Sequence, residues 1–219
     1  MFNRAIRWEV PGIASNPMAA VDKRKENNQR DRVLSAPELS SVIAAVDQSD
    51  CEMLPYIVRM YVYTGARRTE VLRAQWTHID WNNRQWKIPE NKSGKVRYVP
   101  LSDYILQMLS HMHPASESRY VFANPKTQEP YINIYHSWNK ARIEAGVPDV
   151  RIHDFRHAAA SYMVNIGVSL YEVKDMLGHS NIRTTQRYAH LSHERQLRSS
   201  NQLADYINQS TSLIEANGT

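Results

Sequence analysis

The residues with the clearest potential for chemistry lie near the C-terminal end, where Tyr188 follows His179 by nine positions. His179 comes directly after Gly178, and glycine enters the left-handed backbone region that ends many helices without strain. Ser180 and Asn181 can cap a following helix by accepting hydrogen bonds from its free amide groups. The spacing predicts a corner between two helices that holds His179 and lets Tyr188 project from the segment beyond. Alone, the same pattern is more typical of packing residues near a turn.

Cationic side chains stand at the ends of three other predicted elements: Arg67 after Thr64-Gly65, Lys92 at a hairpin tip, and His153 with Arg156 at a helix start. A tyrosine that attacks a phosphodiester needs such groups. Arginines stabilise the charge that gathers on the phosphoryl oxygens, and a phenol with a pKa near ~10 needs a base or positive surroundings. A lysine can protonate the leaving sugar oxygen, and no metal is then required. Each cation can equally be a solvated surface group, and geometry does not separate His153 from His157.

The elements that must position these residues are mainly helical. A capping box, Ser35-Ala36-Pro37-Glu38, opens a helix that runs to about Val46. Helical spacing predicts further helices at about 51–63, 67–74, 102–112, 131–145, 153–166, 169–177, 181–189 and 193–208.

From Trp76 to Leu101 the apolar period changes to two, which predicts a β-hairpin whose basic tip is 91–95, with Val96, Tyr98 and Val99 on its second strand. The predicted fold class is mainly α with a small antiparallel β-hairpin or sheet.

The predicted helix 153–166 can be read by angle. At about 100° per residue, one apolar stripe holds Phe155, Ala159, Tyr162, Met163 and Ile166. His153, Arg156 and His157 fall on the opposite side, which predicts that they are exposed. A cationic pair at a helix start suits an anion, because the helix N-terminus is itself partly positive.

Composition limits the class of protein. The chain has 219 residues and a formal net charge of +5, which mildly favours an anionic partner. The single cysteine, Cys51, excludes an internal disulfide framework and a cysteine-based zinc site. No apolar run is long enough to span a membrane, and the first residues lack the apolar core of a signal peptide. We therefore expect a soluble, cytoplasmic protein with no membrane partner.

Five motifs together resemble the catalytic domain of the tyrosine recombinases, the phage-integrase family of site-specific DNA recombinases. They occur in the family's order and spacing across roughly residues 33–190, and they are Thr64-Gly65-Ala66-Arg67-Arg68-Thr69-Glu70, Lys92-Ser93-Gly94, His153-Asp154-Phe155-Arg156-His157, Leu177-Gly178-His179 and Tyr188. The resemblance implies DNA strand cleavage and rejoining through a 3′-phosphotyrosyl intermediate, without metal, ATP or another cofactor.

The resemblance also implies a role for each matched residue. Tyr188 would attack the scissile phosphate, Arg67 and Arg156 would bind its non-bridging oxygens, and His179 would assist them. His153 would handle the tyrosine proton, and Lys92, which has a nearby rival in Lys95, would protonate the leaving 5′ oxygen. Glu70 would hold Arg67 or a neighbouring group. Lys95, Arg183 and Arg187 are further candidates for DNA contacts.

Three segments follow from the same reading. Residues 33–190 are expected to form the catalytic domain. Residues 1–32 resemble the last helix of an N-terminal DNA-binding domain followed by a flexible basic linker, because residues 22–32 carry five positive charges against three acids and no apolar side chain. Residues 191–219 are expected to form a C-terminal helix and tail that docks on a neighbouring protomer.

The implied partner is double-stranded DNA with specific recombination sites. The family resemblance implies a homotetramer on DNA, a monomer in isolation, accessory proteins, and a bacterial or phage source. Two alternatives stay open at this point. A type IB topoisomerase-like enzyme would share the chemistry but relax supercoils, and a non-catalytic DNA-binding accessory protein would bind DNA with a steep salt dependence and form no covalent adduct.

Overall fold

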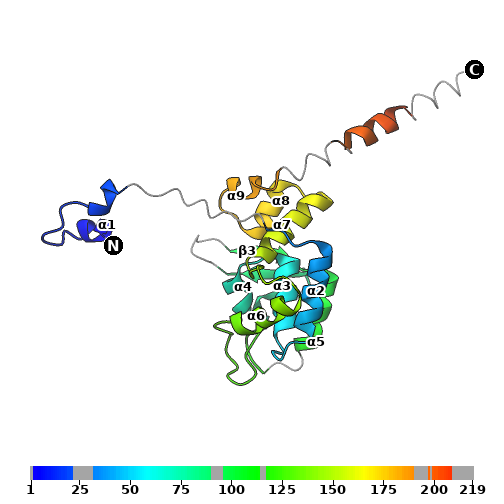
Figure 1. The fold of residues 1–219 in the computed structure, drawn as a ribbon, viewed down its shortest axis with the longest axis horizontal. Helices are drawn as coiled ribbons and strands as arrows, with labels where there is room; N and C mark the ends of the chain where they lie inside the picture. Colours follow the sequence, from blue (N-terminus) through cyan, green and yellow to red (C-terminus); the bar gives the residue numbers. More distant parts are fainter. Residues whose placement is uncertain are drawn as a thin grey trace, which may run out of the picture. The chain divides into compact units, whose positions relative to one another are not determined.

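The computed structural model describes residues 2–21, 32–89, 96–113, 117–189, 197 and 199–208 (Figure 1). The chain divides into two compact units, Met1–Asp31 and Arg32–Thr219. The predicted basic linker at 22–31 and the hairpin tip at 90–95 lie outside the described residues. In the part of the chain that the structure describes, no helix is long and apolar enough to cross a membrane.

The first unit is small. It holds the helix α1 (Phe2–Arg7) and the 3-10 turn η1 (Pro17–Ala20), neither of which contains a buried residue. Asn16 caps η1 by accepting a hydrogen bond from the amide of Met18, and it donates from its side chain to Asn3 at 2.7 Å. Trp8 is 70% exposed. The origin of this unit in a DNA-binding domain stays a prediction.

The second unit is mainly helical, as the sequence predicts. Its elements are α2 (Ala36–Asp47), α3 (Leu54–Thr64), α4 (Arg68–Leu72), η2 (Trp76–His78), β1 (Ile79–Asp80), β2 (Gln85–Ile88), β3 (Arg97–Pro100), α5 (Asp103–Met112), α6 (Tyr135–Glu144), α7 (Asp154–Ile166), α8 (Leu170–Leu177) and α9 (Arg183–Gln186). Residues 199–208 are also helical. The expected helix at 181–189 is shorter than predicted, because the chain leaves α9 as a turn at Arg187.

Local sequence signals explain several helix starts. The capping box of α2 forms as predicted, with Ser35 and Glu38 each accepting from the other's backbone amide, and Ser169 with Glu172 repeats it at α8. The hydroxyl of Ser102 caps α5 by accepting from the Ile105 amide. These caps satisfy amide groups that have no partner inside a helix.

The sheet has three antiparallel strands in the order β1-β2-β3. The predicted hairpin is β2 paired with β3, in the register Trp86 opposite Val99 and Ile88 opposite Arg97. The additional strand β1 pairs with β2 through Ile79 and Trp86. On the predicted second strand, Val96 and Tyr98 are about half exposed, whereas Arg97 and Val99 turn inward.

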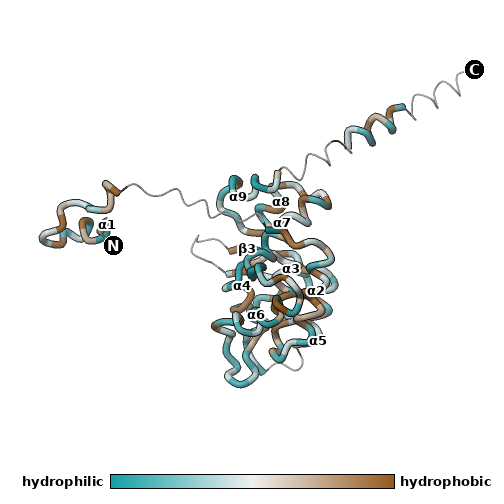
Figure 2. Tube along the Cα trace, viewed as in Figure 1, coloured by the Kyte–Doolittle hydropathy of each residue, from teal (hydrophilic) through white to brown (hydrophobic). Residues whose placement is uncertain are grey.

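The main core lies among α2, α3, α6, α7 and the sheet, and hydrophobic residues recur along these elements (Figure 2). Trp138 of α6 packs edge to face on Phe155 of α7, with ring centres 5.1 Å apart. A second, smaller cluster joins α7, α8 and the end of α9: Ala160, Val164, Val173, Leu177 and Tyr188. This second cluster fixes the corner that carries His179 and Tyr188.

The buried and exposed faces predicted for α7 from its apolar stripe are wrong in part. Phe155 and Ala159 are buried as predicted, but Ile166 is 76% exposed and Arg156, expected on the exposed side, is only 5% exposed. The reason is that α3 and α8 both pack on α7. A helix covered from two sides has no single solvent face, and the hydrophobic angle of one helix does not contain this information.

Candidate active site

Tyr188 points into the protein. It lies just beyond α9, where its amide donates to the carbonyl of Thr185 at 3.0 Å, and its side chain is only 4% exposed within the second apolar cluster. Its hydroxyl lies 2.5 Å from Nδ1 of His157. The phenol is therefore positioned by packing around the ring and by one short hydrogen bond at its tip.

His157 is neutral near pH 7. Burial, followed by the positive charge of Arg187, lowers the pKa of the His157 imidazole to about 4. A neutral imidazole protonated at Nε2 accepts a hydrogen bond at Nδ1, so the Tyr188 hydroxyl donates to it. The site thus places an acceptor for the phenol proton in contact with the phenol.

His153 stands beside His157 rather than on the phenol. The two rings meet edge to face, with centres 5.0 Å apart and planes at 89°. Burial and the charge of Arg156 lower the pKa of His153. The sequence did not separate the two histidines by geometry, and the family resemblance favoured His153 for the tyrosine proton. In the structure, His157 makes the contact with Tyr188, and the role of His153 stays a prediction.

Arg156 connects three helices at the centre of the site. Its Nη1 donates to the carbonyl of Gly65 after α3, and its Nη2 donates to the carbonyl of Leu177 at the end of α8, both at 2.7 Å. Burial, and then the charges of Arg67 and Arg97, lower the pKa of Arg156 to about 10. The guanidinium remains protonated at neutral pH and is held in one orientation by neutral carbonyls, which leave its charge uncompensated.

Arg67 and Arg97 share one carboxylate. Glu70 accepts from Arg67 Nη1 at 2.9 Å through one oxygen and from Arg97 Nη2 at 2.6 Å through the other. The second oxygen also accepts from the backbone amide of Arg67 at 2.7 Å. The side chains of Glu70 and Arg97 are 6% and 10% exposed, whereas that of Arg67 is 40% exposed. Arg67 is therefore the member of this network that a ligand in solvent reaches.

The last turn of α8 supplies a cluster of carbonyl acceptors to these arginines. Arg97 Nη1 donates to the carbonyl of Met176 at 2.9 Å, Arg156 to that of Leu177, and Arg67 Nη2 to that of Gly178 at 2.8 Å. The last carbonyls of a helix have no partner inside it and carry partial negative charge. The end of α8 thus gathers three guanidinium groups around one point.

Two glycines allow this close approach. Gly65 and Gly178 have φ values of +60° and +68°, where a side chain is strained. A Cβ on Gly65 would lie 2.4 Å from Cδ2 of Leu177, and one on Gly178 would lie 2.7 Å from Nη1 of Arg97. Each glycine of the two sequence motifs therefore makes room for a neighbour that the site requires.

His179 is fixed by the segment that leads to Tyr188. Its Nδ1 lies 2.8 Å from the hydroxyl of Thr185, which is fully buried. Burial, followed by the charges of Arg156 and Arg67, lowers the pKa of His179 to about 4. The contact at Nδ1 leaves Nε2 as the ring nitrogen that a ligand can use.

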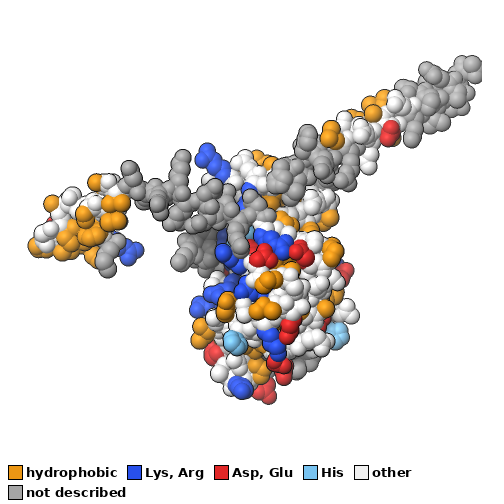
Figure 3. Space-filling model, viewed as in Figure 1, with side chains coloured by type: hydrophobic (Ala, Val, Ile, Leu, Met, Phe, Trp, Pro, Cys, Tyr) orange, Lys and Arg blue, Asp and Glu red, His pale blue; other side chains and the backbone are white. Residues whose placement is uncertain are grey.

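The predicted residues fall into two groups. The structure brings together Arg67, Glu70, Arg156, His179 and Tyr188 with His153 at the edge, and Lys and Arg side chains are visible over α4 and β3 in Figure 3. Lys92 and Lys95 lie outside the described residues. Arg183 is exposed at the start of α9, and the guanidinium of Arg187 lies 5.7 Å from the ring centre of Tyr188.

Two site residues were missed or left undecided by the sequence reading. Arg97 is absent from the predicted site. The signal that could have indicated it is a charged residue within an otherwise mostly apolar strand, directly after the basic hairpin tip. His157 is not separated from His153 by sequence geometry. Its contact with Tyr188 depends on how the segment after α9 meets α7, and no spacing within the sequence encodes that packing.

Comparison with known proteins agrees with this arrangement. The model of the phage integrase family matches residues 32–195. The shufflon-specific DNA recombinase of Escherichia coli is 31% identical over 192 residues, which cover 87% of this chain and 48% of that protein. The integrase of Salmonella phage P22 is 29% identical over 204 residues, which cover 86% and 51%. The chain spans about half the length of these curated relatives.

Solved structures show the same fold. The catalytic domain of bacteriophage HP1 integrase superposes with a TM-score of 0.61 at 28% identity, covering 78% of this chain and 96% of that one. A lambda integrase dimer bound to a COC′ core site superposes with a TM-score of 0.65 at 20% identity, covering 85% and 55%, and shows a shared fold alone. These likenesses confirm the predicted fold class. Since the family model also covers most of the chain, the resemblance seen in the motifs is confirmed, and the chain belongs to the phage integrase family.

Proposed function

We propose that this chain is the catalytic part of a site-specific DNA recombinase that cleaves and rejoins DNA strands through Tyr188. The observation that carries the proposal is a phenol hydrogen-bonded to a neutral histidine beside three guanidinium groups, of which Arg67 and Arg97 share the carboxylate of Glu70 and Arg156 is held by backbone carbonyls. The similarity to a shufflon-specific DNA recombinase and to a phage integrase favours recombination over a type IB topoisomerase or a non-catalytic accessory protein.

The chemistry follows from the contacts. Tyr188 Oη forms a bond to phosphorus while its proton passes to His157 Nδ1, and the bond from phosphorus to the 5′ oxygen breaks. The leaving 5′ oxygen takes a proton from a general acid, for which Lys92 is the candidate from the sequence. The 3′-phosphotyrosyl bond keeps the energy of the phosphodiester, so attack by another 5′-hydroxyl rejoins the strand without ATP.

The arginines stabilise the charge that develops on the phosphoryl oxygens. Arg67 and Arg156 are the two guanidiniums that we assign to the non-bridging oxygens, with His179 Nε2 as an additional donor. Because carbonyls and Glu70 already fix both guanidiniums, little reorganisation is needed when charge develops. Replacing either arginine by Gln should slow cleavage on the order of 10²–10³-fold, as for other donors to a transition-state oxyanion.

The covalent intermediate gives the direct test. A pool of duplexes with a randomised central sequence and a nick within it is incubated with the chain, so that the cut end diffuses away and traps the adduct. A protein–DNA band that survives denaturation and is absent with Tyr188→Phe supports the proposal. A band that persists with Tyr188→Phe, or no band with the unmodified chain across the pool, would contradict it.

The two histidines can be separated in the same assay. We assign the proton to His157, so His157→Gln should slow formation of the adduct by about 10²–10⁴-fold, the range for loss of a general base. His153→Gln should have a smaller effect. The reverse order would instead assign the proton to His153, as the family resemblance suggested.

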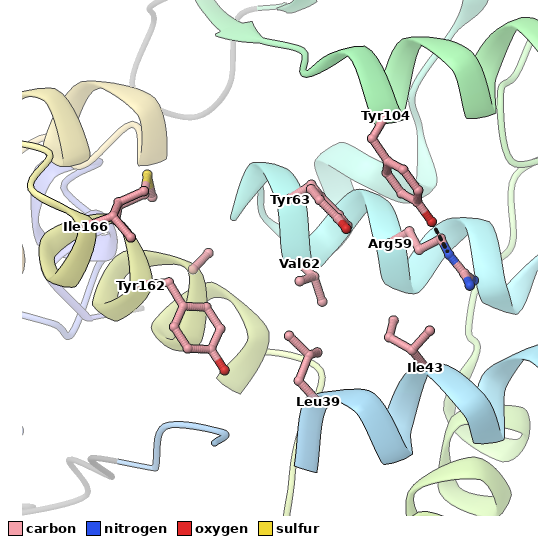
Figure 4. A pocket seen from close by; sticks show the side chains of 10 residues that line it. Leu39, Ile43, Arg59, Val62, Tyr63, Tyr104, Tyr162 and Ile166 are labelled. Carbon is pink, nitrogen blue, oxygen red and sulfur yellow. Dashed lines mark hydrogen bonds between the residues drawn. The ribbon is translucent and has the colours of Figure 1, made fainter. Parts of the chain in front are cut away.

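We further propose that copies of the chain assemble on DNA, with residues 191–219 of one copy packing on the next. An apolar cleft of about 420 Å³ lies among α2, α3, α5 and α7 (Figure 4). Tyr63 stacks on Tyr104 in it with ring centres 4.9 Å apart, Arg59 donates to the Tyr104 hydroxyl, and Ile166 is 76% exposed at its rim. An exposed apolar surface of this kind marks an interaction site more often than a solvated one.

The helix at residues 199–208 carries exposed apolar side chains, which suit an apolar cleft on another copy. Leu203 and Ile207, one helical turn apart, are 59% and 50% exposed. The double variant Leu203→Glu with Ile207→Glu should reduce the mass of the DNA-bound assembly measured by mass photometry, whereas Gln202→Glu on the same helix should not. An unchanged assembly in the double variant would refute docking by this segment.

A further inference from the structure

A second basic site lies next to the candidate active site but uses different residues. It is a pocket of about 380 Å³ between the start of α4, the helix α6 with the two residues before it, and the segment before α7. Its polar and aromatic lining consists of Arg68, Asn133, Tyr135, Trp138, Arg142 and Arg151. Neither the family motifs nor the chemistry above assigns a role to these side chains.

The charge of this pocket is uncompensated. Three arginines from three separate elements line it, and no acidic residue does. Arg142 donates only to neutral oxygens, those of the Val150 carbonyl and the Asn139 side chain. Among the residues that the structure describes, none of the three guanidiniums lies within ion-pair distance of a carboxylate. Like charges held together in this way favour binding of an anion.

Trp138 also lines this pocket. The indole N–H of Trp138 is buried, and it has no hydrogen-bond partner in the part of the chain that the structure describes. The aromatic ring of Tyr135 lies with its centre 6.0 Å from the Arg142 guanidinium and limits where that group can move.

The pocket and the active site are joined through the chain itself. Arg68 directly follows Arg67, and Arg151 precedes His153 by two residues. Consecutive Cα atoms are only about 3.8 Å apart, while successive phosphates of one DNA strand are spaced about 3.4 Å along the helix axis. The start of α4 and the segment before α7 therefore each carry residues of both sites, which places the pocket within reach of a strand bound at Arg67 and Arg156.

We propose that this pocket, formed by Arg68, Arg142, Arg151 and Trp138, binds one backbone phosphate of the cleaved DNA strand next to the scissile phosphate. The inference rests on the proposed function, because it takes the substrate to be DNA. A phosphate fits better than a base or an acidic side chain of another protein. Planar guanidinium forks match phosphate oxygens in pairs, and the two non-bridging oxygens of a phosphodiester can accept from guanidinium groups on separate elements. The pocket would set the register of the strand and take no part in bond breaking.

The test combines protein variants with DNA in which single phosphates are made neutral. Arg68→Gln, Arg151→Gln and the double variant are compared with Arg119→Gln, an exposed arginine outside the pocket. Arg142 is left in place because it also supports the Val150 carbonyl. Affinity for a duplex captured in the covalent assay is measured over a range of salt, and again with a methylphosphonate at each position around the cleavage point.

Each pocket arginine that contacts a phosphate should contribute to the salt dependence of binding. We expect the log–log salt slope to fall by about 1 in the double variant, the change for one phosphate contact, and to stay unchanged in Arg119→Gln. One flanking methylphosphonate should weaken binding by the unmodified chain roughly 10- to 150-fold, the size of one charge-assisted hydrogen bond. The double variant should be insensitive to that same modification.

Three results would overturn the proposal. The first is a salt slope that does not change in the double variant. The second is a double variant that is as sensitive to every methylphosphonate as the unmodified chain. The third is a loss of affinity that follows removal of a base from the DNA, which would indicate that the pocket binds a base. A fourth result would also overturn it: self-association of the unmodified chain in the absence of DNA that is lost in the double variant, which would indicate an acidic protein partner. The rate of covalent adduct formation at saturating DNA should not change in either single variant. Failure of the unmodified chain to form a Tyr188 adduct would count against the proposed function, whereas the salt slope on any duplex would still report on the pocket.

Discussion

At the scale of single residues, the site is built from groups whose protonation is set by their surroundings. His157 and His179 are both half-buried beside arginines, and the pKa of each is lowered to about 4. The unfolded chain has histidines with pKa values near ~6.5. Between these values the unfolded state binds more protons than the folded state, so the folded state loses stability as pH falls from about 6.5 toward 4.

His157 allows this linkage to be tested. In His157→Gln, the side-chain oxygen can still accept from Tyr188 but does not titrate, so the free energy of unfolding should decline less steeply from pH 6.5 to 4.5 than in the unmodified chain. Urea unfolding at several pH values measures the slope. His179 continues to contribute with the same sign, so the slope should be reduced and not abolished. Parallel slopes in the two proteins would show that His157 is not held neutral.

Arg97 is expected to act as a positioning residue. Arg97→Ala leaves Glu70 without its second partner and the Met176 carbonyl without a donor, so the free energy of unfolding should fall by about 1–3 kcal/mol, the cost of unsatisfied buried polar groups. Misplacement of Arg67 should also slow covalent adduct formation, on the order of 10²-fold for a shift of about 1 Å.

Arg97→Lys distinguishes positioning from bulk stability. Lysine keeps the charge and one contact to Glu70 but not the fork that reaches Met176, so it should restore part of the cleavage rate lost in Arg97→Ala. A fully active Arg97→Ala protein at a temperature where it is folded would remove Arg97 from the site.

At the scale of elements, the active site depends on how the end of α3, the end of α8 and the start of α7 approach one another. Gly65 lies at the closest point, where a Cβ would meet Leu177 Cδ2 at 2.4 Å and Ala159 Cβ at 3.3 Å. The geometry of the three guanidiniums is therefore a property of helix packing as much as of the arginines themselves.

Gly65→Ala should destabilise the protein more than a glycine substitution in open space. Gly146 has a similar φ of +73° but nothing within 4 Å of its added Cβ, so Gly146→Ala carries only the left-handed strain of roughly 1–2 kcal/mol. Gly65→Ala adds overpacking of about 1–3 kcal/mol. The difference between the two variants in chemical denaturation isolates the cost of separating α3 from α8. Equal losses would mean that Leu177 moves aside without cost.

At the scale of the whole molecule, the second unit contains its own apolar core, and the described elements of the first unit contain no buried residue. Deletion of residues 1–31 should shift the thermal midpoint of the second unit by less than about 2 °C. A loss of about 1 kcal/mol in the free energy of unfolding would lower the midpoint of a domain of this size by more than that. Differential scanning calorimetry measures the midpoint. A larger drop would show that the first unit contributes to the stability of the second.

The sequence by itself determined the local structure and the identity of most of the chemistry. The capping boxes at Ser35 and Ser169, the glycines at helix ends and the change of apolar period at the hairpin each depend on neighbours within a few residues, so they can be read from the chain. The five motifs likewise predicted the family, because their order and spacing are properties of the sequence.

The tertiary structure decided which groups meet. Arg156 is buried and not exposed because α3 and α8 both cover α7, and His157 rather than His153 contacts Tyr188 because the segment after α9 folds back onto α7. Arg97 joins Glu70 across 27 residues, and Arg156 joins Gly65 across 91. Contacts at such separations arise from packing of whole elements, and a pattern that repeats over a few residues cannot encode them.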